Sequence, residues 1–313
     1  MRSKHTFCIA EHLLDVVFAE SDTNNASLLP SFEPFAVKVN NDGRLVFKDG
    51  TPCPQKANSL LFTITVDDSL MPRHNNEREQ VDTFDTGNGT TTVDTTTDGG
   101  YQFIIKDIHG GSCCMLQTNR DFTEAKCALN GNMAMRQFGL NNALMMMYAF
   151  RGSFFKTLLI HASLVRNNGY GYAFIAKSGT GKSTHTALWM KHIKGCDLMN
   201  DDNPIVRVID NKAYVYGSPW SGKTPCYRNV KAPLGAITKI DRAKTNSVEK
   251  LSPTIAFTQV LPACSSMKWD TVVYRNTYDT IISLIETTPS INVLHCRPDK
   301  EAALVCHDAI AIK

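Results

Sequence analysis

The sequence predicts an α/β protein in two parts, a β-rich region over residues 1–130 and an α/β domain over residues 131–313. In the first part, short runs of β-branched and aromatic residues alternate with turn dipeptides such as Asp-Gly. In the second part, an apolar run at 172–176 leads into a glycine-rich segment and then into residues 184–193, which lack Gly and Pro and can form a helix. The chain is also long enough for two domains of ordinary size.

The N-terminal region is interpreted as strands joined by turns. Residues 5–18 are rich in β-forming residues and predict a strand, and residues 26–35 predict a short turn or helix. The stretch 75–100 is rich in Thr, Asp, Asn and Gly, so we expect an extended connection or a polar hairpin there. Further strands are predicted at 36–39, 45–47, 60–66, 101–105 and 113–116.

Residues 131–151 predict a helix, because apolar side chains recur there at three- and four-residue steps. The methionines at 145–147 are interpreted as core filler rather than as part of a cofactor site. The remaining elements are predicted, in order, as a strand at 157–165, a strand at 196–199, a hairpin over 205–216, a strand at 235–240, a helix from 253 toward 261, a helix at 269–286, a strand at 291–296 and a helix at 298–309.

The composition excludes several classes of protein. Hydrophobic residues make up 42% of the chain, enough for a real core, so a disordered or collagen-like chain is excluded. The net charge of +3 is too small to indicate binding to nucleic acid or to an anionic membrane. No segment has the apolar length of a membrane span, and the ten cysteines show neither CxxC pairs nor metal-ligand spacing. We therefore expect a cytoplasmic protein, either as a monomer or as a homo-oligomer.

One segment has the residue types and spacing of a phosphate-binding loop. Residues 176–184 read Ala-x-x-x-x-Gly-Lys-Ser-Thr, with a small residue where the common pattern has its first glycine. In such a loop the glycines let backbone N–H groups point at phosphate oxygens, and the next helix aims its positive end at the same place. The alternative is an ordinary strand–turn–helix connection. The predicted nucleotide-binding residues are Ser178, Gly179, Thr180, Gly181, Lys182, Ser183 and Thr184.

The same pattern assigns two chemical roles within the loop. Lys182 is expected to contact the β- and γ-phosphates, and the Ser183 hydroxyl is expected to ligate Mg²⁺. The expected cofactors are therefore ATP and Mg²⁺.

Asp201 and Asp202 are the strongest candidates for chemistry outside the loop. They follow Lys182 by 19 and 20 residues, which is enough for one helix, a turn and a strand. We therefore expect them at the sheet edge that carries the loop, where open α/β sheets bind ligands. Two adjacent carboxylates can divide the work, one holding Mg²⁺ and the other acting as a base on a hydroxyl. The alternative is a solvated turn, since Asn-Asp-Asp-Asn-Pro also suits a turn.

Three further residues are weaker candidates. His161 lies in an apolar strand that precedes the loop strand, where it can tune a carboxylate or be a satisfied core histidine. Lys223 and Arg228 lie in a segment rich in Gly, Ser and Pro, where they can clamp phosphate charge or be surface cations. His185 is expected on the solvated or packed face of its helix.

These residues together resemble a known family. The strand with His161-Ala-Ser, the loop 178–184 and Asp201-Asp202 before a hairpin resemble the catalytic domain of HPr kinase/phosphorylase and the related phosphoenolpyruvate carboxykinase fold. Residues 180–189 and 217–223 more narrowly resemble uncharacterised bacterial proteins related to those enzymes. The resemblance covers residues 155–310 and does not reach the first 130.

The resemblance implies a role for each matching residue. Lys182 contacts phosphate, Ser183 and Asp202 lie near Mg²⁺, and Asp201 is the acid/base on the acceptor serine, supported by His161. The implied activity is an ATP- and Mg²⁺-dependent kinase that transfers the γ-phosphoryl group to a hydroxyl, namely serine of a protein, a peptide or a small molecule.

The chain also departs from the family. Thr184 replaces the acidic residue that follows the loop serine, and the downstream substrate-serine signature is missing, so HPr itself is not the favoured acceptor. One alternative is a carboxykinase-like or phosphorylase small-molecule enzyme on the same fold, although its Lys/His metal pair and oxaloacetate-binding arginine cannot be placed. The other alternative is a non-catalytic ATP-binding sensor.

Overall fold

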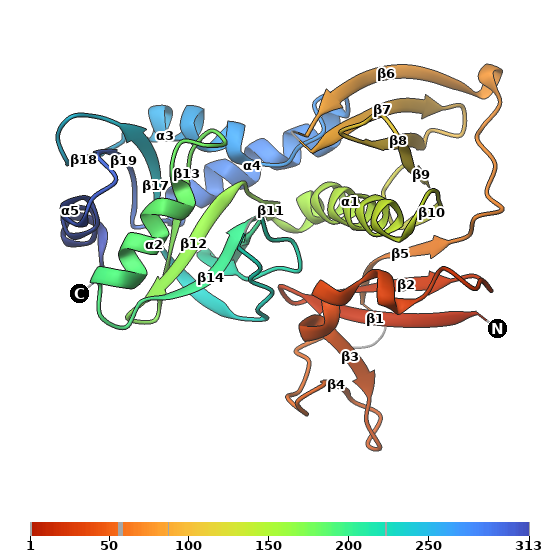
Figure 1. Cartoon of the computed structure of the whole chain (residues 1–313), viewed down its shortest axis with the longest axis horizontal. Coiled ribbons are helices and arrows are strands. Elements are labelled where there is room, and N and C mark those ends of the chain that lie inside the picture. The colour runs from red at the N-terminus through yellow and green to blue at the C-terminus, as the bar shows by residue number, and fades with distance from the viewer. Residues whose placement is uncertain (1, 56–58, 87, 223, 313) are drawn as a thin grey trace. The chain divides into compact units, whose positions relative to one another are not determined.

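The computed structural model describes residues 2–55, 59–86, 88–222 and 224–312. The chain divides into two compact units, Met1–Gly152 and Ser153–Lys313. Each unit combines a large sheet with one or more helices, so the chain is a mixed α/β protein (Figure 1).

The first unit is built on one sheet, whose strand order over the described residues is β4-β3-β1-β2-β5-β10-β9-β8-β7-β6 (Figure 1). Its strands are β1 (Ser3–Ile9), β2 (His12–Phe18), β3 (Ala36–Val39), β4 (Leu45–Phe47), β5 (Leu60–Val66), β6 (Arg78–Asp85), β7 (Gly89–Thr96), β8 (Tyr101–Asp107), β9 (Ser112–Thr118) and β10 (Glu124–Leu129). The single strand expected over 5–18 is instead the hairpin β1–β2, which turns at Ala10 and Glu11 with φ of 44° and 63°. The polar stretch 75–100 forms the hairpin β6–β7, one of its two predicted forms.

Helix α1 (Met133–Gly152) belongs to this first unit. It contacts β5, β8, β9 and β10 and buries Leu140, Leu144 and Met147. The unit boundary therefore lies after Gly152 rather than after residue 130, because the apolar face of the helix covers the preceding sheet. The sequence predicted the apolar face of this helix, but it did not show that the helix packs on the first unit and not on the second.

The second unit contains a mixed sheet. Its strands are β11 (Thr157–Leu159), β12 (Ala162–Asn167), β13 (Tyr170–Ile175), β14 (Asp197–Asp202), β15 (Ile205–Ile209), β16 (Lys212–Tyr216), β17 (Lys231–Arg242), β18 (Ser247–Lys250) and β19 (Ser290–Cys296). Strands β13 and β14 both pair antiparallel with β12, while β17 is parallel to β13 and β19 is parallel to β17. The carboxyl ends of β13, β14, β17 and β19 therefore share one edge of the sheet.

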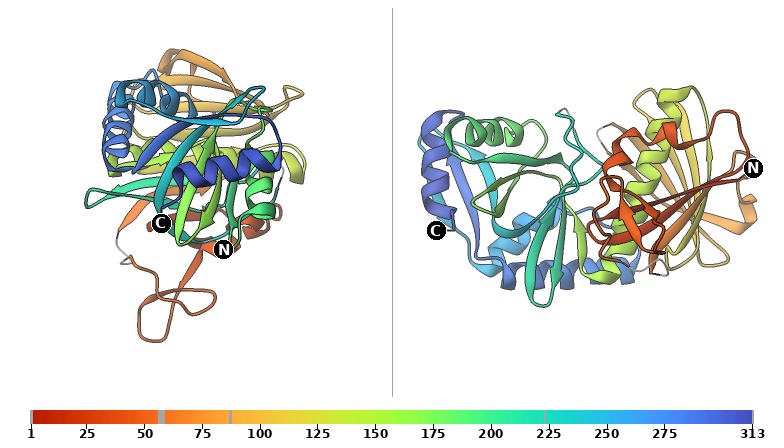
Figure 2. Two further views of the ribbon diagram at one scale, coloured as in Figure 1. Left: turned by 90° about the vertical axis from the view of Figure 1, so that its left-hand side faces the viewer. Right: turned by 90° about the horizontal axis from the view of Figure 1, so that it is seen from below.

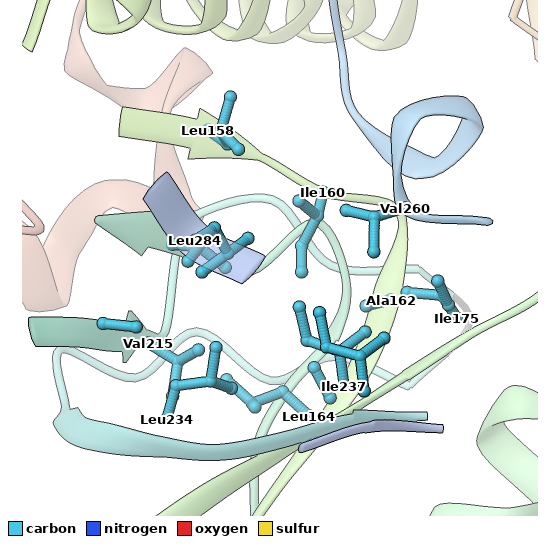
Figure 3. Close-up of a cluster of buried hydrophobic side chains, with 14 of the residues drawn as sticks. Leu158, Ile160, Ala162, Leu164, Ile175, Val215, Leu234, Ile237, Val260 and Leu284 are labelled. Atoms are coloured by element: carbon cyan, nitrogen blue, oxygen red, sulfur yellow. The ribbon is translucent and has the colours of Figure 1, made fainter. Parts of the chain in front are cut away.

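Helices cover both faces of this sheet. Helices α2 (Lys182–His192) and α5 (Lys300–Ile310) contact each other over one face (green and dark blue in Figure 2), where Trp189 and Cys306 join a buried cluster. Helices α3 (Pro253–Val260) and α4 (Thr271–Thr287) cover the other face. There Val260 and Leu284 meet sheet residues such as Leu164 and Ile237, as Figure 3 shows.

The apolar run 157–165 is two strands rather than the single strand expected. Strand β11 pairs with β15, whereas β12 pairs with β13 and β14. Between them, Ile160 bridges to Cys264, and the backbone N–H of His161 donates to the carbonyl of Ala263 at 2.6 Å. These partners lie a hundred residues further along the chain, so the break has no local signal. The break between the two strands places His161 directly before β12, at the sheet edge where β13 and β14 end.

Candidate active site

The predicted loop lies between β13 and α2, in the strand–loop–helix context that its pattern requires. Gly179 has a φ of 75° and Gly181 a φ of 130°, values that favour glycine. Gly181 directly precedes the first turn of α2, whose N–H groups have no partner within the helix. Ser178 and Thr184 are exposed on either side of this turn.

The Lys182 side chain is buried and turned toward the sheet edge. Its Nζ donates to the carbonyl oxygen of Ala176 at 3.1 Å and lies 2.6 Å from Nε2 of His161. Burial lowers the pKa of Lys182, against the opposing effect of the Asp202 and Asp201 carboxylates. The ammonium is therefore held at the base of the loop by Ala176 and His161.

The two aspartates have different partners. Asp201 is buried, and its Oδ1 accepts a hydrogen bond of 2.9 Å from the Ser183 hydroxyl. The side chain of Asp202 is 30% exposed, and its Oδ1 lies 3.2 Å from Nδ1 of His161. The carboxylates thus form two separate pairs, Ser183–Asp201 and His161–Asp202.

His161 connects the lysine to the second carboxylate. Burial is the main cause that lowers the pKa of His161, and the Lys182 charge lowers it further, against the Asp202 and Asp201 carboxylates. The ring is therefore neutral at pH 7. Both of its contacts are satisfied when Nδ1 carries the proton and donates to Asp202, while Nε2 accepts from Lys182.

The backbone of Asp202 is held in an unusual conformation. Its φ is 131°, a left-handed value that costs a non-glycine residue about 1–3 kcal/mol. It forms a bridge with Ser221, and the Asn203 side-chain amide donates to its Oδ2 at 2.8 Å. Next to it, the backbone N–H of Gly222 donates to the Asp201 carbonyl at 2.5 Å. These contacts maintain the strained residue and aim its carboxylate at His161.

A buried amide fixes the segment that carries Ser221. The Asn200 side chain donates to the carbonyl oxygens of Ser218 and Trp220, at 3.4 and 3.1 Å, and to that of Cys226, at 3.4 Å. Its Oδ1 accepts from the backbone N–H of Asn203 at 3.1 Å. Asn200 therefore ties the segment after β16 to the end of β14, although nothing in its sequence context distinguished it.

The structure does not bring Arg228 to this cluster. Arg228 donates to Asp197 Oδ2 at 2.7 Å and to the Leu198 carbonyl, at the opposite end of β14 from the aspartate pair. Asp197 also receives a two-point contact from Arg166, at 3.0 and 2.9 Å. The other predicted cation, Lys223, lies outside the described residues.

His185 is a packed residue rather than a member of the site. Its Nε2 accepts from the indole N–H of Trp189 at 3.0 Å, and its ring lies edge-on to Phe174. Burial lowers its pKa to about 4, so the ring is neutral at pH 7.

Arg242, a residue that sequence reasoning missed, contacts the loop directly. Its Nε donates to the Thr180 carbonyl at 3.0 Å, and its Nη2 donates to the Gly179 carbonyl at 2.6 Å. It is the last residue of β17, two positions beyond the strand end expected at 240. Its position as a cation at the carboxyl end of a strand was the one available signal.

The oxygen atoms of Ser183 and Asp201 at the sheet edge fit Mg²⁺ only if a ligand supplies further oxygens to the metal. Across the described ranges, no group of three or more His, Cys, Asp or Glu side chains is arranged to hold a metal ion. Mg²⁺ usually takes one or two protein oxygens and fills its other positions with phosphate and water. The hydroxyl of Ser183 and the carboxylate of Asp201, 2.9 Å apart, supply such oxygens.

Comparison with known proteins adds no assignment. No protein-family model matches the chain, and a search of the curated proteins found no match either. In the part of the chain that the structure describes, no helix is both long enough and apolar enough to cross a membrane.

Proposed function

We propose that this chain is an ATP- and Mg²⁺-dependent kinase of HPr kinase and carboxykinase type that transfers the γ-phosphoryl group to a hydroxyl. The observation that carries the proposal is one connected arrangement at the sheet edge. The loop lysine Lys182 contacts His161, His161 contacts Asp202, and the loop serine Ser183 contacts Asp201. An anion-binding loop, a hydroxyl–carboxylate pair and a carboxylate with its own histidine are the parts that phosphoryl transfer needs.

The loop would bind the triphosphate of ATP. Backbone N–H groups of the loop and of the first turn of α2 would surround the phosphates, and Lys182 would move from the Ala176 carbonyl to a phosphate oxygen. Mg²⁺, when bound by Ser183 and Asp201 together with the phosphates, supplies positive charge that offsets the charge on the transferred group. Positioning and charge neutralisation would account for most of the catalysis.

The contacts favour an exchange of the two aspartate roles that the resemblance implied. Asp201 is the carboxylate bonded to the loop serine, so it is the better partner for the metal. Asp202 is more exposed and is paired with a neutral histidine, so it is the better base for an incoming hydroxyl. We therefore assign Asp201 to Mg²⁺ and Asp202 to proton transfer.

In the proposed step, the γ-phosphoryl group moves from ATP to the acceptor hydroxyl. The acceptor hydroxyl oxygen attacks the γ-phosphorus as its proton moves to an oxygen of Asp202. The bond from the γ-phosphorus to the bridging oxygen breaks, and that oxygen leaves with ADP. His161 donates to Asp202 and keeps its carboxylate aimed at the hydroxyl. The acceptor is a serine hydroxyl of a protein or peptide, or a small-molecule alcohol.

Transfer of label from γ-labelled ATP tests the proposal. The protein is incubated with Mg²⁺, labelled ATP, and free serine, free threonine or a cell extract. We expect label on an acceptor with the wild type and with Asp210→Asn, a matched variant at the exposed turn between β15 and β16. Lys182→Ala should transfer none, and Asp202→Asn should transfer label at least about 100-fold more slowly.

Two results would redirect the assignment. ATP binding without transfer to any acceptor, unchanged in Asp202→Asn, would favour a sensor without turnover. A requirement for carbon dioxide or pyrophosphate would favour a carboxykinase-like or phosphorylase reaction on the same fold.

A further inference from the structure

Arg242 connects the end of β17 to the phosphate-binding loop across 62 residues of sequence. Its two hydrogen bonds end on consecutive carbonyls, those of Gly179 and Thr180. Its own backbone is anchored, because Arg242 pairs with Cys296 of β19 and the next N–H, from Ala243, donates to the Cys296 carbonyl at 3.0 Å. The loop is thus attached to a fixed point of the sheet.

The length of β17 explains how this side chain reaches the loop. Ile175, the last residue of β13, pairs with Lys239, so β17 continues for three residues after β13 has ended. Three strand residues span about 10 Å, which lifts Arg242 from the sheet to the level of the loop. The neighbouring carboxylate of Asp241 lies 3.1 Å from Lys239, which leaves the guanidinium directed at the loop carbonyls.

We infer that Arg242 is a positioning residue that holds the loop in its anion-accepting conformation before the nucleotide arrives. Each peptide unit is planar, so fixing a carbonyl also fixes the following N–H on the opposite side. Arg242 therefore directs the N–H group of Gly181 by holding the Thr180 carbonyl, and it supports the loop turn in which the Thr180 N–H donates to the Lys177 carbonyl at 3.2 Å. Its planar fork can hold two acceptors at once, which a lysine cannot do with fixed geometry.

A loop that is already ordered loses less conformational entropy when the nucleotide binds. Arg242 therefore raises the affinity for the nucleotide and does not change the rate of the chemical step. This consequence rests on the proposed function. The holding of the loop does not, because it is a property of the protein without ligand.

Amide hydrogen exchange of residues 176–184 in the nucleotide-free protein tests the first part. Arg242→Gln should exchange about fivefold faster in this segment, and Arg242→Lys should fall between it and the wild type. Lys244→Gln, an exposed lysine two residues further on, is the matched control and should exchange like the wild type. Unchanged exchange in Arg242→Gln would overturn the inference.

Calorimetry with ATP and Mg²⁺, and steady-state kinetics, test the second part. Arg242→Gln should raise the Kd and KM for ATP by a similar factor, with kcat at saturating ATP and the melting temperature unchanged. A fall in kcat with an unchanged KM would overturn the positioning role. If wild-type protein binds no ATP at all, the proposed function fails, while the exchange experiment still decides whether Arg242 holds the loop.

Discussion

Nζ of Lys182 lies 2.6 Å from Nε2 of His161, although 21 residues separate them in the sequence. The contact joins the first residue of α2 to the residue that precedes β12, and it continues through the histidine ring to Asp202. The loop lysine and a candidate base are therefore connected through one histidine ring. Substitutions at His161 should therefore lower kcat more than they lower the affinity for ATP.

Replacing His161 by alanine should separate these two effects. The variant loses the Nδ1 donor that aims Asp202, so we expect kcat to fall about 100-fold, within the range for general acid–base groups. Lys182 and the loop remain, so the Kd for ATP should stay within about threefold, a difference of less than 1 kcal/mol. Steady-state kinetics and calorimetry with ATP and Mg²⁺ measure the two quantities. An ATP affinity that falls as much as kcat would contradict the assignment.

Asparagine variants at the two aspartates should differ in their dependence on Mg²⁺. Asp201→Asn removes a charged partner of Ser183 and should raise the Mg²⁺ concentration needed for half-maximal activity, about tenfold or more. Asp202→Asn should lower kcat by about 100-fold or more and leave the Mg²⁺ requirement unchanged. Titrating activity against Mg²⁺ for both variants gives the comparison. The opposite pattern would restore the roles that the sequence resemblance implied.

Gly222→Ala should impair catalysis through contact with Asp202. An added Cβ would lie 3.0 Å from the Asp202 Cβ and 3.3 Å from its carboxyl carbon, closer than ordinary contact. The carboxylate must then shift, and a misplacement of this kind lowers kcat by about tenfold or more. Thr224→Ala, an exposed neighbour, is the control and should keep the wild-type kcat. Wild-type kcat in Gly222→Ala would show that the Asp202 geometry is not needed.

Acid should destabilise the second unit partly through Asp197. Burial raises the pKa of Asp197, but hydrogen bonds from Arg166 and Arg228 outweigh it, so the folded pKa is lower than the unfolded one. A lowered folded pKa stabilises the fold above the unfolded pKa of about 3.9, and this stabilisation is lost as the pH falls further. The side chains of Arg166, Asp197 and Arg228 are 33%, 37% and 38% exposed, so solvent screens their charges. The contribution of these ion pairs to the free energy of unfolding is therefore about 1 kcal/mol or less.

Urea unfolding at pH 7 and at pH 3 measures this effect. Asp197→Asn should be less stable than the wild type at pH 7, and the difference should shrink at pH 3, because that pH is below the unfolded pKa of about 3.9 and part of the stabilisation is lost there. The difference at pH 7 should also shrink in 1 M salt. A stability difference that is the same at both pH values would mean that the charge of Asp197 does not contribute.

Local patterns were enough to predict most elements of the fold. The helix at 131–151, the strands at 36–39, 45–47 and 60–66 and the hairpin over 205–216 occur as expected, because periodicity and turn residues act within one segment. The run 157–165 was wrong as a single strand, since its break depends on hydrogen bonds to Ala263 and Cys264. Strand β10 was not expected, and it is held by its neighbours β5 and β9.

The sequence by itself determined the phosphate-loop pattern and the aspartate pair, since the loop is one short segment and the pair follows it at a spacing that fits one helix and one strand. Only the tertiary structure decided which side chains meet. In the folded chain, Ser183 contacts Asp201 and His161 contacts Asp202. Arg228 contacts Asp197, and Arg242 contacts the loop. The physical reason is that these contacts depend on strand order, register and strand length. Those quantities are set by the packing of the whole sheet, and no local spacing of residues encodes them.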